Sequence, residues 1–182
     1  MRLPLIVLLA AVSVPALFAQ SGRPSPVVVT GELKEWHKVT LTLDGPQASE
    51  SGTEPNPFLD YRMTVTFSHE PDGLKHVVPG YFAADGNAGA TSATSGAKWR
   101  AHFAPDKTGR WNWQISFVSG KRIAVDDGAG QPVAGCDGIK GTIQIARTDK
   151  KAPDFRARGR LHYVGGHYLQ FAGTGEDRKS VV

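Results

Sequence analysis

Apolar and polar residues alternate along most of the chain from Val39 onward, which predicts β-strands. In WHKVTLTLDG, the apolar residues Val39, Leu41 and Leu43 are separated by single polar residues. Successive side chains of a strand point to opposite faces, so such a stretch has one dry face and one wet face. The same alternation runs through DYRMTVTFSH, KWRAHF, RWNWQISFV and GIKGTIQIAR.

Turn-forming residues fill the intervals between these stretches, as in DGPQASESGTEPNP and DDGAGQPVAGCDG. No window of useful length has the apolar spacing of a helix, so a parallel sheet with helical crossovers is excluded. Short one-sided strands joined by such turns predict an all-β fold, an immunoglobulin-like antiparallel β-sandwich over residues 27–147. The pieces RLHYVG and HYLQFAG, beyond the charged stretch TDKKAPDFRARG, either complete the sandwich or lead into a second domain.

The first 19 residues predict a secretory signal peptide. One positive charge at Arg2 precedes an apolar run from Leu3 to Phe18, and small residues surround the expected cleavage site near Ala19. The run is broken by Pro15 and is shorter than the ~20 residues of a membrane-spanning helix. We therefore expect a secreted or periplasmic protein that has no membrane partner after cleavage.

The charge limits which partners are expected, and the cysteine content limits what can stabilise the domain. The formal net charge is +4, and no segment combines clustered basic residues with stacking aromatics, so nucleic acid is not an expected partner. Cys136 is the one cysteine and cannot form an internal disulfide, so burial of apolar surface must stabilise the exported domain.

Aromatic residues provide the candidate ligand contacts. Trp111 and Trp113 share the apolar face of their strand, which favours the core over a sugar-stacking platform. Trp36 has the parity of the wet face and is a candidate for an exposed contact. Tyr81 and Phe82 lead into a long loop of small polar residues, from Tyr81 to Lys98, which we expect either to bind a ligand or to be a disordered surface loop.

Catalytic and metal-binding patterns are not evident in the sequence. There is no Gly-x-Ser-x-Gly elbow, Cys136 has no nucleophile context, and His162 and His167 lie on opposite strand parities. Glycosidase chemistry needs two converging carboxylates, and nothing in the sequence pairs those near turns: Glu32, Glu35, Asp44, Glu54 and Asp60. We predict no catalytic residue, no metal ligand and no cofactor, and leave calcium at the loop residues Asp126, Asp127 and Asp137 as a conjecture.

Three collinear blocks carry a resemblance to a known family. GELKEWHKVTLTLDGPQ, EPNPFLDYRMTVTF and the run from VVPGYFAADGNAGATSATSG to RWNW lie within residues 27–120 and resemble domain of unknown function 5060. The resemblance implies the N-terminal β-sandwich module of a secreted bacterial protein. In such proteins a (β/α)-barrel resembling glycoside hydrolases follows, and some carry the name collagenase.

The last six residues indicate that the natural coding sequence is cut off before the end of the chain. Asp177 to Val182 correspond to the translation of GATCGGAAGAGCGTCGTG, the core of a common sequencing adapter whose next triplet is a stop. We expect residues 177–182 to be adapter sequence, and residues 148–176 to be a linker and the start of a missing barrel. Without the signal and this stretch, the loss of Arg2, Arg178, Lys179 and Asp177 lowers the formal charge from +4 to +2.

These observations predict a non-catalytic accessory domain of a secreted, carbohydrate-active hydrolase. Its expected partners are its own missing barrel and polysaccharide, with contacts at Trp36, Tyr81 and Phe82. The alternative is a stand-alone exported module that binds glycan or protein. The two differ in whether the coding sequence continues beyond Glu176.

Overall fold

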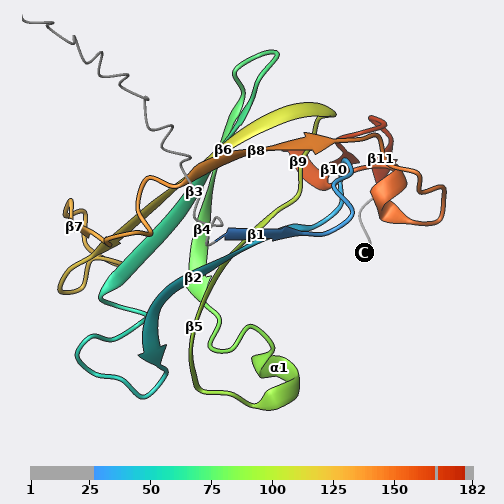
Figure 1. The fold of residues 1–182 in the computed structure, drawn as a ribbon. Helices are drawn as coiled ribbons and strands as arrows, with labels where there is room; N and C mark the ends of the chain where they lie inside the picture. Colours follow the sequence, from blue (N-terminus) through green and yellow to red (C-terminus); the bar gives the residue numbers. More distant parts are fainter. Residues whose placement is uncertain (1–26, 167, 179–182) are drawn as a thin grey trace, which may run out of the picture.

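The computed structural model describes residues 27–166 and 168–178 of the chain. The predicted signal peptide and the last four residues of the predicted adapter stretch lie outside these ranges. Within them the fold is all-β and antiparallel, as predicted: a strongly curled sheet whose two halves pack face to face as a sandwich (Figure 1). No helix among the described residues is long and apolar enough to cross a membrane.

The sandwich has two layers of strands. The first layer contains β1 (Val27–Thr30), β2 (Val39–Ser49) and β5 (Ser95–Phe103), with β2 in the middle. The second contains β3 (Tyr61–His69), β6 (Gly109–Ser119), β7 (Gln131–Pro132) and β8 (Lys140–Ile145), with β7 and β8 both paired to β6. All these pairings are antiparallel.

Strand β4 (Lys75–Phe82) joins the two layers. Residues 75–79 pair with β3 in the second layer, and residues 80–82 pair with β5 in the first. The change of partner occurs at Pro79 and Gly80. A Cβ at Gly80 would lie 2.8 Å from the Met63 side chain, so glycine lets β4 approach the core closely as it crosses.

The core lies between the layers and is built from the predicted dry faces. Val39, Leu41 and Leu43 of β2 are fully buried. They belong to one core cluster with the apolar positions of the other strands: Met63, Val65, Phe67, Trp99, Ala101, Phe103, Trp111, Trp113, Ile115, Phe117, Ile143 and Ile145. Trp111 is fully buried and Trp113 is 6% exposed, which confirms that both belong to the core.

Four strands were not predicted from the sequence: β1, β4 and the two-residue strands β7 and β11 (Asp177–Arg178). Strand β4 extends into the stretch that was expected to form a loop from Tyr81 to Lys98. The structure corrects this loop to residues 83–94, because Tyr81 and Phe82 end β4 and β5 begins at Ser95. The corrected loop carries the short helix α1 (Ala88–Thr91), at the end of the sandwich away from the C-terminal strands (Figure 1).

The C-terminal segment forms a separate small sheet. After the 3-10 helix η1 (Phe155–Ala157), the strands β9 (Leu161–Gly165), β10 (Tyr168–Phe171) and β11 (Asp177–Arg178) pair in the order β11-β10-β9. None of them pairs with a strand of the sandwich, so among the described residues RLHYVG and HYLQFAG do not extend it. Figure 1 shows this sheet, in orange and red, beside one end of the sandwich.

Candidate functional site

Tyr81 lies on the outer face of the first layer, where β4 pairs with β5. Its register partner is Arg100, whose own partner on the other side is Thr42 of β2. The side chains therefore form a row across the sheet, because registered residues of neighbouring strands project to the same face. Tyr81 is 44% exposed and is the aromatic member of this row.

A hydrogen-bonded chain holds the Tyr81 ring in place. The phenol oxygen is 2.8 Å from Nε2 of His102, and Nδ1 of His102 is 3.0 Å from the Thr40 hydroxyl. Burial lowers the pKa of His102, and the charges of Lys38 and Arg100 lower it further. The imidazole is therefore neutral at neutral pH, and one of its nitrogens donates while the other accepts.

Arg100 is anchored by a hydrogen bond at one side of its guanidinium and forms none at the other side with the described residues. Its Nε donates to the Thr42 hydroxyl at 3.1 Å, and no described residue accepts from its two terminal nitrogens. The guanidinium faces a polar hollow of about 300 Å³ at the start of the loop that carries α1. Gly86, Asn87 and Gly89 line this hollow together with Tyr81 and Glu50.

This surface presents the groups that proteins use to contact sugars: an exposed aromatic ring, a guanidinium, an amide and hydroxyls. Of the three predicted contacts, only Tyr81 lies in it with its ring exposed. Phe82 is 6% exposed and packs on Trp99, with ring centroids 5.2 Å apart. The structure therefore places Phe82 in the core beneath the hollow.

Trp36 lies elsewhere, at the seam between the sandwich and the C-terminal segment. It is half-buried in the loop between β1 and β2 and has a left-handed φ of 65°. Its indole packs on the backbone of Gly159 and Gly173, where an added Cβ would lie within 3.2 Å of the ring. Trp36, Phe155 and Arg160 line a shallow pocket along this seam.

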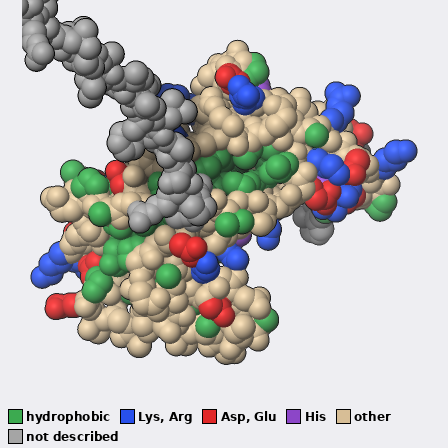
Figure 2. Space-filling model, viewed as in Figure 1, with side chains coloured by type: hydrophobic (Ala, Val, Ile, Leu, Met, Phe, Trp, Pro, Cys, Tyr) green, Lys and Arg blue, Asp and Glu red, His purple; other side chains and the backbone are tan. Residues whose placement is uncertain are grey.

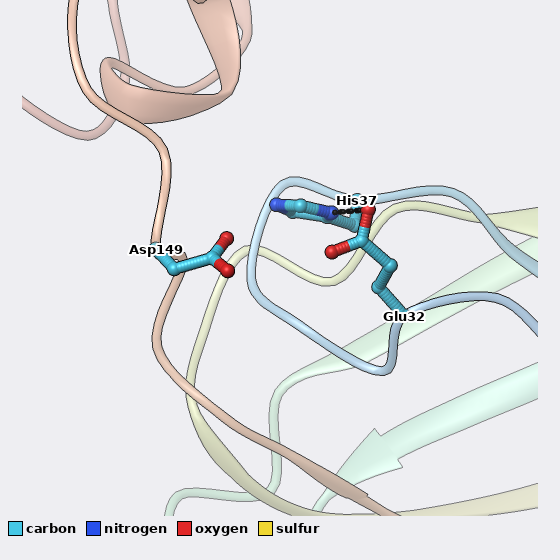
Figure 3. A group of neighbouring side chains, drawn as sticks. All are labelled: Glu32, His37 and Asp149. Atoms are coloured by element: carbon cyan, nitrogen blue, oxygen red, sulfur yellow. Dashed lines mark ion pairs between the residues drawn. The ribbon is translucent and has the colours of Figure 1, made fainter.

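Charged side chains gather at the same end of the molecule (Figure 2). Lys34 contacts Glu32 at 3.1 Å and Asp149 at 2.7 Å, which ties the loop between β1 and β2 to the segment after β8. His37 is buried beside them, with Nδ1 3.4 Å from Glu32 (Figure 3). The hydrogen bond to Lys34 lowers the pKa of Glu32, and it lowers the pKa of Asp149 to about 2.

The sequence analysis did not identify Arg100 and His102 as neighbours of Tyr81, and it did not identify this charged cluster. The alternation in KWRAHF placed Arg100 and His102 on a wet face but gave no partner for either residue. Glu32 was considered only as a carboxylate near a turn. Asp149 is 117 residues further along the chain, so their meeting depends on the fold.

Comparison with known proteins identifies the sandwich. Residues 32–118 match the family described as domain of unknown function (DUF5060). The chain carries a DUF5060 domain. The match covers strands β2 to β6 almost completely, and it includes Trp36, Tyr81, Arg100 and His102. No curated protein matches the chain significantly.

The fold is also found in a solved structure. The chain is similar to the crystal structure of a putative glycoside hydrolase from Bacteroides vulgatus ATCC 8482, with a TM-score of 0.50 and 21% sequence identity. The similarity covers 79% of this chain and 20% of that protein, so the DUF5060 chain spans about a fifth of its length. At this identity the likeness concerns the fold.

Proposed function

We propose that this DUF5060 chain is a non-catalytic accessory module of an exported, carbohydrate-active hydrolase. The family match over residues 32–118 is the observation that carries the proposal. The fold likeness to a much longer protein described as a glycoside hydrolase supports it. In this proposal the catalytic groups belong to a following domain, and the sandwich contacts polysaccharide.

The C-terminal sheet supports the idea that another domain packs beside the sandwich. It exposes four large apolar side chains close together in sequence: Tyr163, Val164, Tyr168 and Leu169. Leu169 is 40% exposed, whereas Phe171 is only 3% exposed because it packs under Phe155 and Arg158. The exposed set is a suitable surface for a following domain.

Within the sandwich, the row around Tyr81 is the proposed polysaccharide contact. A sugar ring would stack on Tyr81, and its hydroxyls would accept from Arg100 and Asn87. The hydrogen bond to His102 fixes the Tyr81 side chain before binding, which reduces the entropy lost on association.

The polysaccharide contact can be tested with the purified chain by affinity electrophoresis against a panel of soluble polysaccharides. Tyr81→Ala should weaken retention by about tenfold, as expected for loss of an anchoring aromatic. Tyr168→Ala is the matched control, because Tyr168 is similarly exposed on the separate C-terminal sheet. Equal retention of the Tyr81→Ala variant and the unaltered chain would disprove a contact at this row.

The multidomain proposal has a separate test. The source DNA is amplified and sequenced across the codon for Glu176. We expect the reading frame to continue into strand–helix repeats. Genomic DNA that itself encodes Asp-Arg-Lys-Ser-Val-Val and a stop would contradict the proposal and favour a stand-alone glycan-binding module. The exposed row around Tyr81 could contact a glycan without a second domain.

A further inference from the structure

The charged cluster at the seam contains a buried histidine nitrogen without a hydrogen-bond partner. The His37 side chain is 2% exposed, and its Nδ1 is one of two buried side-chain polar atoms among the described residues that have no such partner. Buried polar atoms are nearly always satisfied, because leaving one unpaired costs the free energy of its desolvation. A ligand that accepts the Nδ1 lone pair would remove this cost.

The surroundings of the His37 imidazole are those of a cation-binding site: Nδ1 faces Glu32, and Asp149 lies toward the other end of the ring (Figure 3). One ligand atom each from Glu32, His37 and Asp149 lies within 4.8 Å of the other two. The three side chains converge from two segments of the chain (Figure 3). Nδ1 is 3.4 Å from Oε1 of Glu32. Two ligands of a tetrahedral zinc ion with bonds of ~2.0–2.1 Å are separated by about 3.4 Å.

The far side of the imidazole is held in the way that metal-binding histidines require. Nε2 of His37 is 3.2 Å from the Thr148 hydroxyl. When Nε2 carries the proton and donates it to Thr148, the Nδ1 lone pair faces the Glu32 carboxylate, and two electron-rich atoms oppose each other unless a cation lies between them. Hydrogen bonding of the second ring nitrogen is the usual support for a ligating histidine.

Lys34 leaves one oxygen of each carboxylate available. Its ammonium contacts Oε2 of Glu32 and Oδ2 of Asp149. The other oxygens, Oε1 and Oδ1, have only longer contacts of 3.4–3.8 Å with His37, Arg156 and Lys150. Glu32 and Asp149 are 46% and 56% exposed, so water can reach a fourth ligand position.

We propose that Glu32, His37 and Asp149 bind a divalent zinc-class ion through the imidazole of His37 and one oxygen of each carboxylate. A mixed set of imidazole and carboxylate ligands suits Zn²⁺. The ion links the loop between β1 and β2 to the segment that follows β8. It thereby fixes the start of the C-terminal segment against the sandwich, independently of whether the Tyr81 row binds polysaccharide.

The test uses the tag-free chain, treated with a chelator and titrated with Zn²⁺ alone by isothermal calorimetry. We expect one equivalent to bind and the thermal midpoint to rise with Zn²⁺ concentration, because the ion binds the folded state preferentially. Glu32→Gln and Asp149→Asn should each weaken binding at least ~10-fold. Both positions are exposed, so these variants should fold even where a change of the buried His37 would not.

Two further variants separate a metal site from an ordinary ion-pair cluster. Glu70→Gln is the matched control, because Glu70 is an exposed carboxylate that pairs with Arg110 and lies outside the cluster, and this variant should bind Zn²⁺ as the unaltered chain does. Lys34→Met removes a neighbouring positive charge and should tighten Zn²⁺ binding by about fivefold. The proposal would be overturned if no binding were detected at ~1 mM Zn²⁺, because such a weak affinity is outside the range of zinc sites. Equal binding by Asp149→Asn and the unaltered chain would also overturn it.

Discussion

The indole N–H of Trp111 donates a hydrogen bond to the backbone carbonyl of Lys107, 3.0 Å away and four residues earlier. It fixes the corner at which the chain enters β6. In immunoglobulin-like sandwiches a tyrosine hydroxyl forms a comparable bond to the backbone a few residues upstream. Trp111 performs this role from a fully buried position, so the same side chain closes the corner and fills the core.

Trp111→Phe should therefore destabilise the fold more than Trp113→Phe. The first change leaves the Lys107 carbonyl without its donor, at a cost of ~1–3 kcal/mol beyond the lost packing. Trp113 is the matched control, because it is similarly buried but its Nε1 has no hydrogen-bond partner. Urea denaturation of both variants measures the difference. Equal losses of stability would show that the corner bond contributes nothing.

Gly141→Ala should destabilise the pairing of β6 with β8. A Cβ at Gly141 would lie 2.4 Å from a ring carbon of Trp113, its register partner, so the buried indole would have to shift to admit it. We expect a loss of ~1–3 kcal/mol in the free energy of unfolding, as for other overpacked cores.

Gly89→Ala is the control for this change. No atom lies within 4 Å of a Cβ there, and the residue is in α1. Alanine should stabilise the chain by up to ~1 kcal/mol, because it restricts the unfolded state more than glycine. A Gly141→Ala variant as stable as Gly89→Ala would contradict the packing of Trp113 against β8.

Glu35→Gln should stabilise the fold at neutral pH. Burial raises the pKa of Glu35 above its ordinary value of 4.5, and Arg147 only partly opposes this. The folded state then binds a proton more readily than the unfolded state, so stability decreases as pH rises through the interval between the two pKa values and remains lower above it. The thermal midpoint of the variant should exceed that of the unaltered chain at pH 7. This difference should become smaller as the pH is lowered to 4. Glu54→Gln, at an exposed carboxylate, is the control.

Asp154→Asn should have the opposite pH dependence. Asp154 accepts from the side chain and the backbone N–H of Arg156, which lowers its pKa to about 2. A lowered carboxyl pKa contributes stability that is present above the unfolded value of 3.8 and is lost as pH falls toward 2. The variant should be less stable than the unaltered chain at pH 7, and the difference should shrink as the pH falls below 3.8 and through about 2. An unchanged difference across this range would exclude the ionised carboxylate as its cause.

The dry faces of β2, β3, β5, β6 and β8 could be predicted because each strand alternates regularly and is buried on one side only. β4 could not be recognised as easily. His76, Val78, Gly80 and Phe82 point inward and share one parity, but histidine and glycine weaken the apolar signal. Pro79 lies in the middle of the stretch and normally argues against an interior strand. The parity shared by Val78 and Phe82 was the one available sign that Phe82 belongs to the core.

The candidate sites were less predictable than the fold because they depend on neighbours across strands and between distant segments. Tyr81 was identified by its type, whereas its support by His102 requires the register of β4 against β5. The contact of Lys34 with Asp149 joins residues 115 positions apart. Alternation along a single strand contains no information about such pairs.

Because β4 hydrogen-bonds to β3 with its first part and to β5 with its last part, neither layer can lose its backbone pairing without disturbing the other. The amide protons of β3 and β5 should therefore exchange with deuterium at closely similar rates, although the two strands face each other across the core. A sandwich whose layers are connected only by loops could open one layer at a time. Here the continuous strand makes the opening of the domain a single event.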